Sequence, residues 1–325
     1  MFRTEISNIP ARFKIDLKDQ TLLLGSCFAL EIGKKMQENK FQASINPAGI
    51  IFNPISLFEL IDYAINDLTP ADSTFLEREE AFYNYKYHSA LRETSQHSLE
   101  KSIKVANAAL KEALTNAKLI VFTFGTAWAY RKKKEDFWVA NCHKVPQTEF
   151  DKRLLSVAEI VDAFKNTYEL IQAMNPEVKI LLTVSPVRHL KDTLTLNSVS
   201  KATLRLACHE ICEAYEQVDY FPAFELLNDD LRDYRFYTTD MLHPNEQAVD
   251  YVWTKFVQSH LSRETQDFLA QWTKLKSALT HKPFNPASAS HQQFLNKTLH
   301  QLEQLGTQVD LTQEIASLQS QLQKT

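Results

Sequence analysis

The chain has 325 residues, 44% of them hydrophobic and 23% charged, a composition typical of a soluble globular protein. This length can form one large domain, or one domain with an appendage. The net charge of −4, with one basic run at 131–134, gives no reason to expect nucleic acid or an anionic membrane as a partner. No stretch approaches the roughly 18 uninterrupted apolar residues that would span a membrane.

The N-terminal residues are interrupted by charges and by Pro10, so they do not form the apolar segment of a signal peptide. The four cysteines do not resemble a disulfide framework in a chain of this length. Cys208 and Cys212 share one face of a predicted helix, with His209 beside them, but no second cluster supplies further metal ligands. We therefore expect a cytoplasmic protein with reduced thiols, no metal site and no cofactor.

Strand and helix signals alternate through the first 261 residues. Short, continuous apolar runs, typical of strands buried on both faces of a parallel sheet, occur at 21–26, 118–125, 179–186 and 218–226. Apolar side chains recur at helical spacing in 28–39, 99–117, 156–174, 200–217 and 245–261. Strands separated by helices of this length predict right-handed crossovers and a three-layer α/β/α sandwich with a mainly parallel sheet.

Two regions inside this domain, which we assign to 1–262, fall outside the alternation. Residues from about 62 to 98 resemble an insertion with some strand character. Residues from about 127 to 142 resemble a β-hairpin whose tip carries the basic run.

The composition changes in 263–325, which we assign to a helical C-terminal extension. Leucines at heptad-like spacing predict two short helices, and Gly306 is a plausible end of the first. These helices either pack back on the domain or form a homodimer through a coiled coil, and the sequence leaves both interpretations open.

Ser26 ends the first predicted strand and opens the first helix. In open α/β sheets, ligands gather at the carboxyl ends of the strands, and a helix N-terminus supplies partial positive charge for a developing oxyanion. A serine becomes a nucleophile when a base is present and an acceptor orients that base. Asp240 and His243 are separated by two residues, so one turn can bring the carboxylate to Nδ1 while Nε2 faces outward. The sequence therefore predicts a Ser26–His243–Asp240 triad.

The letters GSCFA at 25–29 resemble the signature of the bacterial GSCFA family, which is grouped with the SGNH (GDSL-like) hydrolases. Further segments resemble that family in order along 1–262: NPAGIIFNP, FGTAW, NCHK, SPVRH and LRDYRFYTTDMLHP. The resemblance implies a flavodoxin-like α/β/α sandwich with esterase or acyl-group transferase activity. The chain has no G-x-S-x-G elbow, no P-loop and no G-x-G-x-x-G, so these competing motifs do not apply.

Carried onto this chain, the SGNH pattern implies that Ser26 is the nucleophile and that its own N–H is an oxyanion donor. Gly49 is similar to the glycine of the second conserved block, whose N–H would be the next donor. Asp240 and His243 match the final D-x-x-H of the pattern.

The chain departs from the pattern at the third block, where G-x-N is expected and 125–127 reads Gly-Thr-Ala. The asparagine that would complete the oxyanion hole is therefore absent from its place. Thr126 could donate through its hydroxyl, or Asn46 or Asn141 could approach from nearby loops. The loss of one oxyanion donor typically lowers turnover by about 10²–10³-fold.

Four further side chains are candidates for substrate binding. Arg188 and His189 follow the third predicted strand and should lie on the same edge as Ser26. His143 and Asn141 end the predicted hairpin strand and could return towards the site, and Trp128 could offer a stacking face to a sugar. Cys27 is expected to point into the core as a small apolar residue.

These residues predict a serine esterase or acyl-group transferase acting on O-acyl esters. A small-molecule or carbohydrate ester as the substrate follows from the family resemblance alone. The alternative is a catalytically weak or inactive scaffold that serves as a binding or assembly protein, which the missing asparagine and the helical extension favour.

Overall fold

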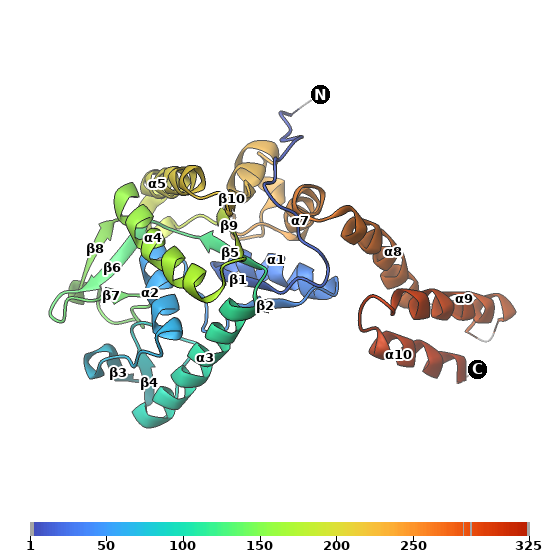
Figure 1. Ribbon diagram of the computed structural model, residues 1–325, viewed down its shortest axis with the longest axis horizontal. Coiled ribbons are helices and arrows are strands. Elements are labelled where there is room, and N and C mark those ends of the chain that lie inside the picture. The colour runs from blue at the N-terminus through green and yellow to red at the C-terminus, as the bar shows by residue number, and fades with distance from the viewer. Residues whose placement is uncertain (1–2, 282, 287, 324–325) are drawn as a thin grey trace.

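The computed structural model describes residues 3–281, 283–286 and 288–323, and its centre is a five-stranded parallel sheet (Figure 1). The strands are β1 (Thr21–Gly25), β2 (Ala43–Ile45), β5 (Leu119–Phe124), β9 (Lys179–Val184) and β10 (Val218–Tyr220). Their order is β2-β1-β5-β9-β10, and every neighbouring pair is parallel. If these five strands are renumbered 1 to 5 along the chain, their order across the sheet is 2-1-3-4-5. This is the flavodoxin-like arrangement, in which the winding of the sheet reverses between β1 and β5.

Helices cover both faces of the sheet, which confirms the predicted three-layer architecture (Figure 1). Leu22 and Leu24 of β1 face one helical layer and Leu23 faces the other, because side chains alternate along a strand. The first layer contains α2 (Pro54–Ile65), α3 (Gln96–Asn116), α4 (Val157–Met174) and α5 (Thr193–Ala214). The second layer contains α1 (Cys27–Glu38) and α7 (Glu246–His260).

Several elements differ from the predicted ones. The short edge strand β2 and the helix α2 have no counterpart in the prediction, and α5 begins at Thr193 rather than at residue 200. The predicted strand 218–226 ends at Tyr220, because Pro222 cannot donate a hydrogen bond to a ladder. The chain continues there as the helical turn α6 (Ala223–Glu225) and the π-helical turn η4 (Leu226–Asp230).

The two regions outside the alternation form small antiparallel sheets. The insertion contains the hairpin β3 (Phe75–Arg78) and β4 (Ala81–Asn84), which confirms its strand character. The predicted hairpin forms from β6 (Trp128–Lys132) and β7 (Trp138–Val139), and β8 (Phe150–Leu154) adds a third strand on the other side of β6. Short 3₁₀ turns are η1 (Asp72–Thr74), η2 (Gln147–Glu149), η3 (Leu190–Asp192) and η5 (Tyr234–Phe236).

The C-terminal region is helical, as predicted, and projects from the α7 side of the domain (Figure 1). It consists of α8 (Arg263–Leu279), α9 (Ala289–Leu305) and α10 (Thr312–Gln323). Leu295, Leu302 and Leu318 are buried in the same apolar cluster as Trp272 of α8. Gly306 ends α9, as expected. No helix in the described part of the chain is long and apolar enough to cross a membrane.

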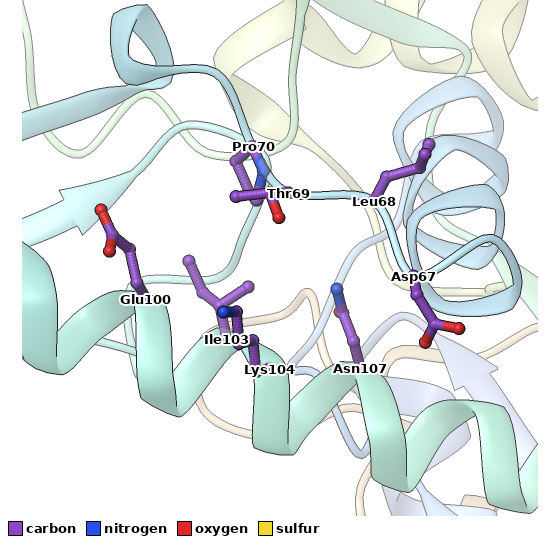
Figure 2. Close-up of a pocket in the computed structure, with 8 residues that line it drawn as sticks. All are labelled: Asp67, Leu68, Thr69, Pro70, Glu100, Ile103, Lys104 and Asn107. Carbon is purple, nitrogen blue, oxygen red and sulfur yellow. The ribbon is translucent and has the colours of Figure 1, made fainter.

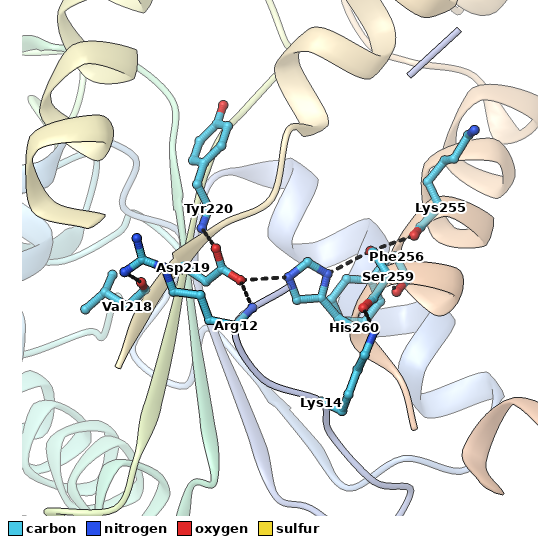
Figure 3. A network of polar contacts seen from close by, with 9 residues as sticks. All are labelled: Arg12, Lys14, Val218, Asp219, Tyr220, Lys255, Phe256, Ser259 and His260. Atoms are coloured by element: carbon cyan, nitrogen blue, oxygen red, sulfur yellow. Dashed lines mark hydrogen bonds and ion pairs between the residues drawn. The ribbon is translucent and has the colours of Figure 1, made fainter. Parts of the chain in front are cut away.

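The N-terminal segment is fastened to the far edge of the sheet and to the end of α7 (Figure 3). The N–H of Arg12 donates to a carboxylate oxygen of Asp219 at 2.7 Å, and His260 Nε2 lies 3.7 Å from the same oxygen. The N–H of Ile15 donates to the carbonyl of His260, and the N–H of Ser262 donates back to Ile15. Backbone hydrogen bonds thus join the N-terminal segment of the domain to the residues at its C-terminal end.

Candidate active site

Ser26 lies where β1 meets α1, at the crevice between β1 and β5 where the winding of the sheet reverses. It is the N-cap of α1, and its Oγ accepts a hydrogen bond from the N–H of Phe28 at 3.3 Å. The side chain is largely enclosed, with the residue 6% exposed. The sequence positions Ser26 here because the apolar strand ends at Gly25 and the helical spacing starts directly afterwards.

Gly25 is the residue that allows β1 to approach β5 so closely. Its φ is +125°, and a Cβ at this position would stand 2.1 Å from the carbonyl oxygen of Thr123. We expect Gly25→Ala to lower the free energy of unfolding by about 1–3 kcal/mol or more, measured by urea denaturation. Gly306→Ala is the control, because Gly306 has a helical φ of −62°, and its cost should stay below about 1 kcal/mol. Equal costs for the two variants would contradict this account.

Asp240 and His243 form the pair that the sequence predicts. Asp240 Oδ2 lies 2.6 Å from Nδ1 of His243. Its Oδ1 accepts hydrogen bonds from the Thr238 hydroxyl and from the N–H groups of Leu242 and His243 at 2.7–3.0 Å. The backbone N–H of His243, followed by its ring and the other two donors, holds the pKa of Asp240 well below its ordinary value. The carboxylate is therefore ionised at neutral pH and fixes the imidazole through Nδ1.

His243 faces an open groove that the start of α1 also lines. The groove has a volume of about 520 Å³, and Cys27 and Phe28 line it together with His243 and Val187. Among the described residues there is no hydrogen bond between Ser26 Oγ and His243. In structures without substrate, catalytic hydrogen bonds are often long and tighten when the substrate binds.

Cys27 is exposed and lines the groove, so the expectation that it points into the core is wrong. The reason is the phase of α1. Phe28, Ala29 and Ile32 occupy the buried face of this helix, which turns Cys27 outwards.

The two oxyanion donors that the family pattern implies, the N–H groups of Ser26 and Gly49, and the alternative donor Thr126 all have hydrogen-bond partners in this structure. The N–H of Ser26 donates to the carbonyl of Thr123 at 3.0 Å, and the N–H of Gly49 donates to the carbonyl of Asn46 at 2.8 Å. The Thr126 hydroxyl is buried, lies 3.0 Å from Ser200 Oγ and accepts from a backbone N–H. Neither of the two backbone N–H groups is therefore a free donor.

Asn46 differs from these groups because its amide nitrogen is unused. Its Oδ1 accepts a hydrogen bond from the N–H of Gly25 at 2.9 Å, which fixes the amide one residue before Ser26. Its Nδ2 is buried and finds no partner among the described residues. A buried amide without a partner costs free energy, so such a group often has a role in binding or catalysis. Asn141, the other asparagine considered, accepts from the N–H of His143 within a tight turn.

His189 follows β9 at the carboxyl edge of the sheet, the edge on which the sequence predicts it. Burial, then the charges of Lys201, His243 and Lys152, lower the pKa of His189 to about 4, so its ring is neutral at pH 7. Its Nε2 would lie 3.3 Å from a Cβ on Gly125, which places the ring over the end of β5. The neighbouring Arg188 donates to the hydroxyls of Tyr234 and Tyr237.

Two family models match this chain. The model of the GSCFA family matches residues 20–256, which is more than half of the chain. The chain belongs to the GSCFA family. A second model, for the C-terminal domain of GSCFA domain proteins, matches residues 272–324. No curated protein matches the chain.

Two candidate substrate contacts of the GSCFA domain lie away from the groove. His143 is buried, its Nε2 pairs with the carbonyl of Asn84 at 2.9 Å, and its ring packs on Tyr83. Trp128 packs under the ammonium group of Lys152 on the small sheet. Neither lines the groove beside His243.

Three residues of the GSCFA domain that contact the site were not predicted from the sequence. Lys201 Nζ donates to the carbonyls of Gly125 and Ser185, both at 2.6 Å, and burial lowers its pKa to about 7. Asn197 and Ser200 lie on the same buried face of α5 and bond the loops after β9 and β5. Polar residues on the buried face of a helix are the signal that could have revealed them, but the helix was predicted to begin only at residue 200.

Another cavity of the GSCFA domain lies elsewhere, between α3 and the loop after α2 (Figure 2). It has a volume of about 250 Å³ and contains none of the predicted site residues. Among the described residues no group of three or more histidine, cysteine or acidic side chains could hold a metal ion.

Proposed function

We propose that this protein is a serine esterase or acyl-group transferase that acts on O-acyl esters through Ser26, His243 and Asp240. The observation that carries the proposal is that the Asp240-held imidazole and the helix start that carries Ser26 flank one groove. The unused amide of Asn46, fixed beside Ser26, supports it further.

In the proposed reaction, Ser26 Oγ attacks the ester carbonyl while its proton passes to Nε2 of His243. Asp240 stabilises the resulting imidazolium. The oxyanion receives a hydrogen bond from Nδ2 of Asn46. As the tetrahedral intermediate collapses, the alcohol leaves with the proton from His243, and the acyl group stays on Ser26.

The acyl group then passes to water, which gives hydrolysis, or to a hydroxyl acceptor, which gives transfer. In both cases His243 takes the proton of the attacking hydroxyl and returns it to Ser26. The groove is open, so it can admit an acceptor larger than water. An acylated carbohydrate or a similar small metabolite is the substrate class that we propose.

The alternative function is a binding or assembly protein on an inactive scaffold. Two observations favour it: Ser26 is mostly enclosed, and its N–H is occupied by the carbonyl of Thr123. The helical C-terminal region could then mediate assembly, including the homodimer considered from the sequence.

Labelling with a fluorophosphonate probe distinguishes the two functions. The probe reacts with activated serines, so we expect covalent labelling of the native protein on the peptide that contains Ser26, identified by mass spectrometry. The Ser26→Ala variant should stay unlabelled, and the Ser259→Ala variant, which removes a buried serine at the end of α7, should label like the wild type. No labelling, or equal labelling of both variants, would favour the inactive scaffold.

A further inference from the structure

A second cavity adjoins the groove on the other side of the loop that follows β9. Its volume is about 480 Å³, and it lies between the first half of α5 and the segment 224–234. Three cationic side chains, Arg188, Lys201 and Arg205, line it, and no aspartate or glutamate does. Its lining is therefore basic, in a protein whose net charge is −4.

Arg188 is a cation of this cavity that lacks a counter-charge. It forms no ion pair with a carboxylate among the described residues, whereas Arg205 is paired with Glu225 at 2.7 Å. Its two Nη atoms donate to the hydroxyls of Tyr234 and Tyr237 at 3.3 and 2.8 Å. Its guanidinium also lies over both rings, 5.3 and 4.6 Å from their centroids. The two tyrosines thus hold the guanidinium of Arg188 in place and leave three of its five N–H donors for a ligand.

Asn197, which also lines the cavity, offers another donor. Asn197 accepts the N–H of His189 through its Oδ1 at 3.0 Å, and no described residue accepts from its Nδ2. Lys201, whose pKa burial lowers to about 7, donates through its Nζ to carbonyls at the ends of β5 and β9. Donors and positive charge surround one space, an arrangement suited to a carboxylate or a phosphate.

The cavity is connected to the proposed catalytic residues through His189 and Val187. Val187 lines the groove beside His243, and the next residue, Arg188, lines the cavity. His189 is held by Asn197 from the cavity side and feels the charge of His243 from the groove side. A ligand that extends from the groove can therefore reach Arg188.

We propose that this cavity binds an anionic group, a carboxylate or a phosphate, on the molecule whose ester is presented to Ser26. The inference rests on the proposed function for the identity of that molecule. The anion site itself rests only on the cavity, on the unpaired Arg188 and on the free amide of Asn197.

Calorimetric titration of the full chain with inorganic phosphate, and separately with benzoate, tests the anion site without any turnover. Arg188→Met should weaken the binding of the preferred anion by about tenfold or more, because a hydrogen-bonded charge pair is lost. Arg232→Met is the matched control: Arg232 is exposed and does not line the cavity, so its removal should change binding by less than about twofold. The anion that binds more tightly, phosphate or benzoate, shows whether the cavity prefers a phosphate or a carboxylate.

Asn197→Asp provides a second variant in case Arg188→Met does not fold. It keeps the acceptor for the N–H of His189 but replaces the free NH₂ with negative charge, so it should abolish anion binding. Equal binding by all variants, or no binding of either anion by the wild type, would overturn the proposal.

Kinetics with two aryl acetates, one neutral and one bearing a carboxylate on the ring, separate this inference from the proposed function. Arg188→Met should lower kcat/KM for the anionic ester about tenfold or more, through KM, and leave the neutral ester within about twofold. If neither ester is cleaved while phosphate binding still depends on Arg188, the esterase proposal fails and the anion site stands. If both esters are cleaved and Arg188→Met affects them equally, the anion site fails and the esterase proposal stands.

Discussion

Replacement of Ser26 by alanine is expected to lower kcat for a short-chain aryl ester by at least about 10⁴-fold. The reason is that the alanine variant has no nucleophile to form the acyl intermediate, while the groove and the Asp240–His243 pair stay in place. The fold should survive, because the loss of an N-cap hydrogen bond costs only about 1 kcal/mol. The measurement is steady-state hydrolysis of the ester, with thermal unfolding as the check on folding.

The Cys27→Ala variant tests whether the neighbouring thiol, rather than Ser26, is the nucleophile. Cys27 is exposed in the groove, and an exposed thiol near an imidazole is itself a chemically reasonable nucleophile. If Ser26 carries the reaction, Cys27→Ala should retain activity within about tenfold. Loss of activity in Cys27→Ala with full activity in Ser26→Ala would transfer the role of nucleophile to the thiol.

Asn46→Asp is expected to lower kcat by about 10²–10³-fold, the usual effect of removing one oxyanion donor. Aspartate has the same shape and keeps the acceptor that the N–H of Gly25 uses, so the turn after β2 should be preserved. It replaces the unpaired Nδ2 by an oxygen that cannot donate and that repels the developing charge. The effect should appear in kcat, measured with the same ester. The reason is that the oxyanion develops in the transition state and is absent from the bound substrate.

Asn141→Asp is the matched control for this change. Asn141 also uses its Oδ1 to accept a backbone N–H, that of His143, but it lies in the turn after the small sheet. The same substitution there should change kcat by less than about threefold. Equal effects at the two positions, or no effect at Asn46, would remove Asn46 from the oxyanion site.

The central sheet could be predicted because its signals are local. The runs that became β1, β5 and β9 are continuous and apolar, as burial on both faces requires, and helices with apolar stripes separate them along the chain. The edge strand β2 has three half-buried residues and no such run, so nothing local distinguishes it from a loop. The short strand β10 was predicted too long, because its apolar residues continue past Pro222 into helical turns.

The pairing of Asp240 with His243 could also be predicted, since the two residues are close enough in sequence to meet within one turn. The groups that are free to donate to an oxyanion could not be predicted from the sequence. Whether a backbone N–H is free depends on which carbonyl group a neighbouring strand presents to it. Ser26 N–H is taken by Thr123 only because β1 and β5 pair in this register. Lys201 was missed for a similar reason: its contacts join two strand ends that are far apart in the sequence.

The closure of the N-terminal segment on the end of α7 has a consequence for biosynthesis. Ile15 emerges early from the ribosome, yet its backbone partners, His260 and Ser262, are synthesised almost 250 residues later. Until then the nascent chain can assemble β1, β5, β9 and β10, and Arg12 can bind Asp219, but the backbone of Ile15 lacks its partners. Completion of the N-terminal closure must therefore wait for the end of α7.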